Sequence, residues 1–218
     1  MPDPRPALSH AHLYLVCGAM PDAFIDACLR GGVNMVQLRV KDGADGEIVD
    51  TARRYAALCA AHGALLILND RPDLVPDARA DGVHVGQDDI DVARARELVG
   101  PARLVGLSTH SPAQIDAAGS DREVDYIGVG PVHATPTKPG RPAVGLELVS
   151  YATAHAATPF FAIGGVDGTN VAAVAQAGAR RVAVVRALTE AADPEHAARI
   201  LRAAVTVTAT SEARVGTT

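Results

Sequence analysis

Three polar side chains, Thr135, Thr137 and Lys138, follow the apolar run Tyr126–Gly130. The run is typical of a buried strand, and glycines and prolines fill the segment beyond it. A strand that leads into hydroxyl and ammonium groups presents several hydrogen-bond donors at one point in space. Donors of this kind suit a phosphate or a pyrophosphate, so the segment predicts an anion-binding site.

A second group of polar side chains ends the apolar run that begins at Met35. Alternation along an extended chain puts Gln37, Arg39 and Lys41 on one side of that run. Inward-facing cations need an anionic partner, because burying an unpaired charge is costly. These residues therefore predict contacts to an anionic ligand, and solvated charges at an exposed strand end are the alternative.

Two neighbouring apolar runs each end near a carboxylate. Asp70 follows Asn69, and Asp89 follows Gly86 after two intervening residues. Two carboxylates beside a diphosphate suit Mg²⁺, which usually takes one or two carboxylates together with phosphate oxygens. The structural alternatives are a helix N-cap for Asp89 and an Asx-turn for Asp70.

Other apolar runs also end in groups that suit a ligand. Ser108 and Thr109 offer hydroxyls, and the pair Gly164-Gly165 lets backbone N–H groups approach an anion closely. A plain turn that requires a positive φ is the alternative for the two glycines. His84 lies inside a run, where a hydrogen-bonded interior residue is favoured over an acid or a base.

These side chains are separated by a regular alternation of short apolar runs and helical patterns. Most runs are continuously apolar, as expected for parallel strands that are covered on both faces. The predicted strands are Leu13–Val16, Met35–Val40, Leu65–Asn69, Gly82–Gly86, Leu104–Ser108, Tyr126–Gly130, Phe160–Gly164 and Arg181–Val185. The predicted helices are Asp22–Arg30, Gly46–Ala61, Asp89–Val99, Pro112–Ala118, Leu146–Ala156, Thr169–Ala177 and Pro194–Ala204, with a short or broken helix over Arg71–Arg79. The predicted caps are Asp89, Ser111, Gly100 and Gly178.

Eight βα units in one domain predict an α/β protein with a (β/α)8 TIM barrel. An open doubly wound sheet is the competitor, but such a sheet more often stops at fewer strands. In a barrel, the chemistry gathers at the carboxyl ends of the strands. The expected single catalytic domain covers residues 1–206, and residues 207–218 are expected to form a frayed tail.

Composition and charge narrow the classes of partner. The chain has 218 residues, of which 48% are apolar, so it can bury one sizeable core. Its formal net charge is −5 and it has no basic patch, so neither nucleic acid nor an anionic membrane is an expected partner. No apolar run approaches the ~20 residues that span a bilayer, and the first residues do not have a signal-peptide pattern. Cys17, Cys28 and Cys59 are scattered, which favours free buried thiols in a reducing cytoplasm.

Several spaced motifs, taken together and in order, resemble the thiamine-phosphate synthase (thiamine-phosphate pyrophosphorylase) family. They are QLRVK (Gln37–Lys41), ND (Asn69–Asp70), DGVHVGQDD (Asp81–Asp89), GLS (Gly106–Ser108), GPVHATPTK (Gly130–Lys138), AIGGV (Ala162–Val166) and VAVVRAL (Val182–Leu188). The resemblance implies a TIM barrel and a Mg²⁺-dependent transferase. It implies that 4-amino-2-methyl-5-hydroxymethylpyrimidine diphosphate is joined to 4-methyl-5-(2-phosphoethyl)thiazole, giving thiamine phosphate and pyrophosphate.

The resemblance also implies a role for each matching residue. Those expected to hold the pyrimidine diphosphate are Gln37, Arg39, Lys41, Asn69, Ser108 and Lys138, of which Arg39, Lys41, Ser108 and Lys138 are expected to be catalytic. Asp70 and Asp89 are expected to ligate Mg²⁺, and the family's GQ-x-D pattern selects Asp89 over Asp88. Those expected around the thiazole phosphate are Thr135, Thr137, Gly165, Val185 and Arg186. Many relatives have Ser at the position of Arg186, so the direction of this side chain is open.

Two other functions are open at this point. A thiazole tautomerase relative shares the barrel and the phosphate site but lacks much of the diphosphate and Mg²⁺ apparatus. A non-catalytic barrel that binds a phosphate ligand needs neither a Mg²⁺ pair nor a lysine for a leaving group. The expected partners are small-molecule substrates, and a homo-oligomer is left open.

Overall fold

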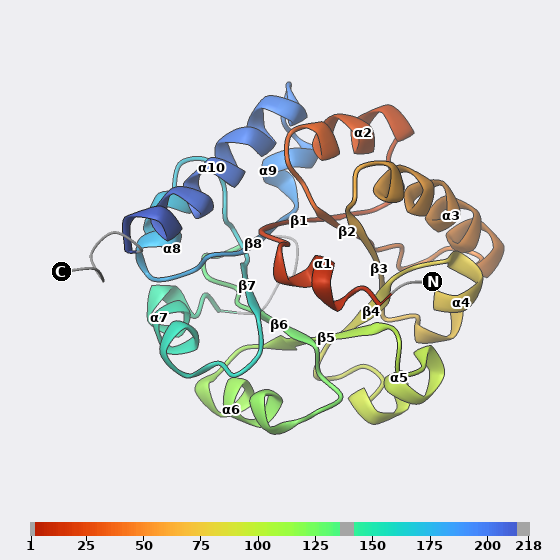
Figure 1. The fold of residues 1–218 in the computed structure, drawn as a ribbon, viewed down its shortest axis with the longest axis horizontal. Coiled ribbons are helices and arrows are strands. Elements are labelled where there is room, and N and C mark those ends of the chain that lie inside the picture. The colour runs from red at the N-terminus through yellow and green to blue at the C-terminus, as the bar shows by residue number, and fades with distance from the viewer. Residues whose placement is uncertain (1–2, 136–141, 213–218) are drawn as a thin grey trace.

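Eight parallel strands close into a barrel in the order of the sequence, and helices surround it (Figure 1). The computed structural model describes residues 3–135 and 142–212, with side chains as far as residue 206. The strands are β1 (Leu13–Cys17), β2 (Met35–Leu38), β3 (Leu65–Asn69), β4 (Gly82–Val85), β5 (Leu104–Thr109), β6 (Tyr126–Val129), β7 (Phe160–Ile163) and β8 (Val182–Val184). β1 pairs with both β2 and β8, which closes the ring. The predicted TIM barrel is confirmed.

The helices lie outside the barrel, except for α1. They are α1 (Arg5–Ser9), α2 (Asp22–Arg30), α3 (Asp45–Ala61), η1 (Pro72–Leu74), α4 (Val75–Ala78), α5 (Val92–Val99), α6 (Pro112–Ser120), α7 (Gly145–His155), α8 (Val171–Gln176), α9 (Arg186–Thr189) and α10 (Pro194–Glu212). The short helices α1 and α9 were not predicted. The last helix also continues past Ala204, where the sequence pattern ended it. In the part of the chain that the structure describes, no helix is both long enough and apolar enough to cross a membrane.

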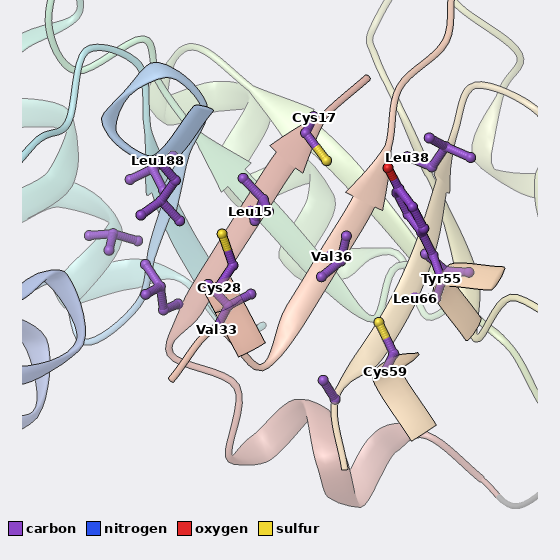
Figure 2. Packing of buried hydrophobic residues seen from close by; sticks show 14 of the residues in the cluster. Leu15, Cys17, Cys28, Val33, Val36, Leu38, Tyr55, Cys59, Leu66 and Leu188 are labelled. Carbon is purple, nitrogen blue, oxygen red and sulfur yellow. The ribbon is translucent and has the colours of Figure 1, made fainter. Parts of the chain in front are cut away.

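The outer layer of the core lies between the strands and the helices. Figure 2 shows Leu15 of β1 and Val36 of β2 in one cluster with Tyr55 of α3 and the three cysteines. The cysteines are Cys17, Cys28 and Cys59; all are buried and free, as predicted. Burial raises the pKa of the Cys17 and Cys28 thiols to about 12, so both stay protonated at neutral pH.

A second cluster fills the inside of the barrel. Alternation turns every second strand residue inward, so Tyr14, Tyr126 and Phe161 meet there although they come from β1, β6 and β7. Their rings pack edge to face, with the Phe161 centroid 5.2 Å from Tyr14 and 5.7 Å from Tyr126. Helix α1 closes the amino-terminal end, because its Leu8 joins this interior cluster.

The caps explain where the predicted and observed helix ends differ. The predicted N-cap at Asp89 was wrong: Asp91 caps α5, and its carboxylate accepts a hydrogen bond from the Arg94 N–H at 2.7 Å. Helix α5 therefore begins at Val92, later than predicted, and the Asp89 carboxylate accepts instead from the Gly86 N–H. Of the other predicted caps, Ser111 and Gly100 are confirmed, and Gly178 lies one residue beyond Ala177, the observed C-cap of α8.

Candidate active site

A pocket of about 170 Å³ opens at the carboxyl end of the barrel. It lies where the parallel strands end, because residues from the ends of β2, β3, β4, β5, β6, β7 and β8 line it. The predicted site residues that line it are Gln37, Arg39, Asn69, Asp70, Ser108, Thr135, Gly165, Val185 and Arg186. Residues that are far apart in sequence thus meet in one cavity.

The other predicted site residues stand apart from this group. Lys41 is exposed beyond the end of β2 and does not line the pocket. Asp89 is also exposed and does not line the pocket, but its carboxylate accepts a hydrogen bond from Gly86, which does. Thr137 and Lys138 lie outside the described residues, so the structure gives no position for them.

The floor of the pocket is polar and joins two predicted ligand contacts. The Gln37 amide donates from Nε2 to the Tyr14 hydroxyl at 2.5 Å, and that hydroxyl lies 3.1 Å from the hydroxyl of Tyr126. His84 Nδ1 lies 3.2 Å from the same Tyr126 hydroxyl, and His84 Nε2 lies 3.0 Å from Ser108 Oγ. As the sequence favoured, His84 is a hydrogen-bonded residue of the barrel interior.

Burial keeps the two phenols of this floor protonated. It raises the pKa of Tyr14 and of Tyr126 far above the ordinary value for tyrosine. The cause is the loss of hydration, which disfavours the phenolate. Each hydroxyl therefore has one proton to donate and an oxygen that can accept.

The ends of β3 and β4 carry the expected metal ligands. Asp70 adopts a left-handed backbone conformation with φ of 57°, and its N–H donates to the His84 carbonyl at 2.9 Å. The Asp89 carboxylate accepts from the Gly86 N–H at 2.8 Å, at the end of the adjacent strand. Both carboxylates thus belong to neighbouring strand ends. Hard carboxylate oxygens of this kind are ligands that Mg²⁺ takes, so the residues present fit a Mg²⁺ ion completed by diphosphate and water oxygens.

No set of three or more His, Cys, Asp or Glu side chains that could hold a metal occurs in the described part of the chain. The expected site is smaller than such a set, because it has only the two carboxylates as protein ligands. Mg²⁺ therefore stays a proposal.

The turn after β7 requires glycine. Gly164 and Gly165 have φ of 103° and 64°, which disfavour any other residue. A Cβ on Gly164 would lie 2.5 Å from Pro131 Cα, and one on Gly165 would lie 2.7 Å from His133 Cβ. The two glycines therefore let the segment after β6 pack closely on this turn, at the edge of the pocket.

The segment after β6 is fixed at both of its described ends. Val132 donates to the Ile163 carbonyl at 2.8 Å and His133 to the Gly164 carbonyl at 2.9 Å, which ties the segment to the end of β7. At the other described end, the Val144 N–H donates to the Pro131 carbonyl at 2.8 Å, so Val144 lies beside the residue at which the segment begins. Thr135, which lines the pocket, lies between these anchors.

The sequence reasoning missed Tyr14, Tyr126 and Gly106. A Cβ on Gly106 would lie 2.2 Å from Tyr126 Cζ and 2.5 Å from His84 Nδ1, so this glycine makes room for both rings. A tyrosine at an inward position of an otherwise apolar strand is the signal that could have revealed the two phenols. Nothing in the local sequence distinguishes the role of Gly106 from that of an ordinary strand glycine.

The fold and the pocket define a TIM-barrel protein with its ligand site at the carboxyl ends of the strands. Residues 13–188 match the family model described as thiamine monophosphate synthase. A thiamine-phosphate synthase of Acidothermus cellulolyticus is 49% identical over 89% of this chain and 94% of the relative. One from Saccharopolyspora erythraea is 48% identical over 91% of this chain and 94% of the relative. The chain therefore belongs to the thiamine monophosphate synthase family, which confirms the expected function of thiamine-phosphate synthase, a transferase of thiamine biosynthesis.

Two further comparisons set the extent of the likeness. The structure of thiamine phosphate pyrophosphorylase from Pyrococcus furiosus superposes with a TM-score of 0.84 at 28% identity, over 94% of this chain and 98% of that one. In contrast, the chain spans only 57% of a 48% identical thiamine-phosphate synthase from Gloeobacter violaceus. The match thus covers the whole barrel, and some relatives are longer.

Proposed function

We propose that this pocket joins the pyrimidine diphosphate to the thiazole phosphate, with Mg²⁺ as the metal, and releases pyrophosphate. The observation that carries the proposal is the composition of one cavity. Gln37, Arg39 and Asp70 line it from the β2 and β3 ends, and Gly165 and Arg186 line it from the β7 and β8 ends. One cavity thus offers groups suited to a diphosphate on one side and to a phosphate on the other.

The residues on the β2–β5 side would hold the first substrate. Arg39 would neutralise the diphosphate, Asn69 would hydrogen-bond it, and Ser108 and Gln37 would contact the ring. Lys41 and Lys138 would add charge to the leaving group.

Asp70 and Asp89 would hold the Mg²⁺ ion. When bound, Mg²⁺ would supply positive charge to the diphosphate oxygens and so make pyrophosphate a better leaving group. The protein's own contribution is to place the two carboxylates at adjacent strand ends, which the hydrogen bonds of Asp70 N–H to His84 and of Asp89 to Gly86 support.

The residues on the β7–β8 side would hold the second substrate. The turn at Gly165 would offer backbone N–H groups to the thiazole phosphate, with Thr135 and Thr137 adding hydroxyls. Val185 would contribute backbone, and the Arg186 side chain, which lines the pocket, would add a charge. That lining position supports a phosphate role for Arg186.

The chemistry requires little covalent work from the protein. The bond between the pyrimidine methylene carbon and the diphosphate oxygen breaks, the electron pair leaves with pyrophosphate, and the aminopyrimidine stabilises the cation. The thiazole nitrogen then forms the new C–N bond. The residues act by aligning the two rings, neutralising the leaving group and excluding water. No nucleophilic side chain is needed for these steps.

Two properties outside the site belong to the same proposal. The free, buried cysteines suit a reducing compartment, so we place the protein in the cytoplasm. Its partners would be the two small-molecule substrates. A homo-oligomer stays a prediction, which the molar mass in solution would test.

The test is to incubate the protein with both substrates and Mg²⁺ and to measure thiamine phosphate and pyrophosphate together. We expect equal amounts of the two products, and neither product when the thiazole phosphate is omitted or when a chelator removes Mg²⁺. Absence of product, with binding of the thiazole phosphate retained, would favour the tautomerase or the non-catalytic barrel instead.

A further inference from the structure

A chain of hydrogen bonds crosses the inside of the barrel below the pocket. It connects Gln37 of β2 to Ser108 of β5 through Tyr14, Tyr126 and His84, which come from β1, β6 and β4. Tyr126 has no exposed surface and does not line the pocket, so it can affect a ligand only through its neighbours. The two ends of the chain are side chains that do line the pocket.

The hydrogens of this chain can be assigned from its first link. The Gln37 amide nitrogen can only donate, so the Tyr14 oxygen accepts there and Tyr14 gives its one proton to Tyr126. Tyr126 then gives its own proton to His84 Nδ1. With Gln37 as the donor, this is the arrangement in which each phenolic proton finds an acceptor among the linked side chains.

The same assignment fixes what the two ends present to a ligand. With Nδ1 accepting, the neutral His84 carries its proton on Nε2 and donates it to Ser108 Oγ. The Ser108 proton is then available to the pocket as a donor. At the other end, the Gln37 amide uses its nitrogen on Tyr14, so its oxygen is available as an acceptor.

We propose that Tyr126, Tyr14 and His84 are positioning residues that hold Gln37 as an acceptor and Ser108 as a donor, and so select an aminopyrimidine ring. An amino group on such a ring donates and its ring nitrogens accept, which complements this pair. A ring with an oxo group in place of the amino group, in its lactam form, presents the opposite pattern. This inference rests on the proposed function and adds the origin of its ring specificity.

The packing supports a fixed chain. Phe161 packs edge to face on both phenol rings, and Gly106 leaves the space that the Tyr126 and His84 rings occupy. Reversing the chain requires the Gln37 amide to flip, both phenols to turn and His84 to change tautomer together. Removing the Tyr126 hydroxyl divides the hydrogen-bond chain into a Gln37–Tyr14 part and a His84–Ser108 part. The direction of the hydrogen bonds can then reverse in each part independently.

The test compares two ligands on three proteins. The ligands are the monophosphate of 4-amino-5-hydroxymethyl-2-methylpyrimidine and its 4-oxo counterpart, and the measurement is the ratio of their dissociation constants by calorimetry. We expect the wild-type protein to prefer the amino ligand and Tyr126→Phe to reduce that preference about five- to tenfold, the worth of one neutral hydrogen bond. Tyr55→Phe is the matched control, because its buried hydroxyl bonds the backbone of Met20 in the outer layer of the core. It is expected to leave the ratio unchanged.

The possible results distinguish a failure of the proposed hydrogen-bond chain from a failure of the proposed function. If Tyr126→Phe folds and keeps the wild-type ratio within about twofold, the positioning role is overturned while the proposed function stands. If neither ligand binds a wild-type protein that does form thiamine phosphate from both substrates and Mg²⁺, the inference alone is overturned. If the wild-type protein forms no thiamine phosphate, the proposed function fails and the inference fails with it. If Tyr126→Phe does not fold, Tyr14→Phe breaks the neighbouring link and is expected to reduce the ratio to the same extent.

Discussion

His84 Nε2 lies 3.0 Å from Ser108 Oγ, and this contact joins an interior histidine of β4 to a hydroxyl of β5 at the pocket floor. The contact depends on Gly106, two residues before Ser108 on the same strand, because a side chain there would strike the rings of His84 and Tyr126. The floor of the site thus depends on the absence of a side chain at Gly106 as well as on its polar groups.

The first prediction concerns that empty position. Gly106→Ala is expected to lower the free energy of unfolding by about 1–3 kcal/mol, the usual cost of overpacking a core, and to reduce turnover. Denaturant unfolding and steady-state rates measure the two effects. Gly46→Ala is the control, because nothing lies within 4 Å of a Cβ added there at the start of α3. An unchanged stability and rate in Gly106→Ala would contradict the close packing.

The second prediction distinguishes the two adjacent aspartates after β4. Asp89→Asn keeps an oxygen that can accept from Gly86 N–H but removes the charge, so the Mg²⁺ concentration for half-maximal activity should rise at least about tenfold. Asp88→Asn is expected to change that concentration much less. Titration of activity with Mg²⁺ compares the two, and a larger effect in Asp88→Asn would reassign the ligand.

The third prediction concerns stability at the opposite end of the barrel. Arg96 and Asp125 form an ion pair at 2.6 Å with side chains only 11% and 10% exposed, and the Asp125 carboxylate also accepts from the Val105 N–H. Asp125→Ala removes the buried partner of Arg96, which keeps its ion pair with the more exposed Glu123 at 3.0 Å, and it also removes the acceptor of the Val105 N–H. It should therefore cost about 1–3 kcal/mol of unfolding free energy. Both Michaelis constants should stay unchanged, because the pair lies away from the pocket.

The control for that variant is an exposed ion pair. Glu97 pairs with Arg94, and both side chains are more than half exposed. Glu97→Ala is therefore expected to cost about 0–1 kcal/mol in the same denaturation experiment. A similar cost for the two variants would show that burial does not decide the worth of the Arg96–Asp125 pair.

The fourth prediction concerns pH. Burial lowers the pKa of His12, and the charges of Arg202 and Arg181 act in the same direction. As the pH falls below 6.5, His12 is therefore protonated in the unfolded chain before it is protonated in the folded protein. The free energy of unfolding should then decrease until the pH reaches the lowered pKa of the folded state. His12→Asn keeps a donor for the Arg180 carbonyl and removes the titration. Its melting temperature should fall less than that of the wild-type protein on acidification, and equal falls would contradict the assignment.

The sequence predicted the barrel well because its signal is local. Each strand is a short apolar run, and most of the observed ends lie within one or two residues of the predicted ones. The exceptions have identifiable causes. Asp91, and not Asp89, forms the N-cap of α5. Helix α1 is too short for a periodic pattern to reveal it.

The site was predicted only in part because its contacts cross the barrel. Gln37 and Ser108 were recognised from their motifs, but the side chains that join them come from other strands. Which inward-facing residues meet depends on how the strands close into a barrel, and no local sequence pattern predicts that closure. The placement of Lys41 outside the pocket has a similar cause, because β2 ends at Leu38 and the inward alternation stops there.

The central claim is that one pocket holds two substrates on opposite sides. The most direct test measures the Michaelis constants of both substrates for Arg39→Ala and Arg186→Ala, since both arginines line the cavity. Arg39→Ala should raise the constant for the pyrimidine diphosphate about tenfold or more and leave that for the thiazole phosphate within about twofold. Arg186→Ala should do the reverse. If both variants impair the same substrate, or if each impairs the other one, the claim is contradicted.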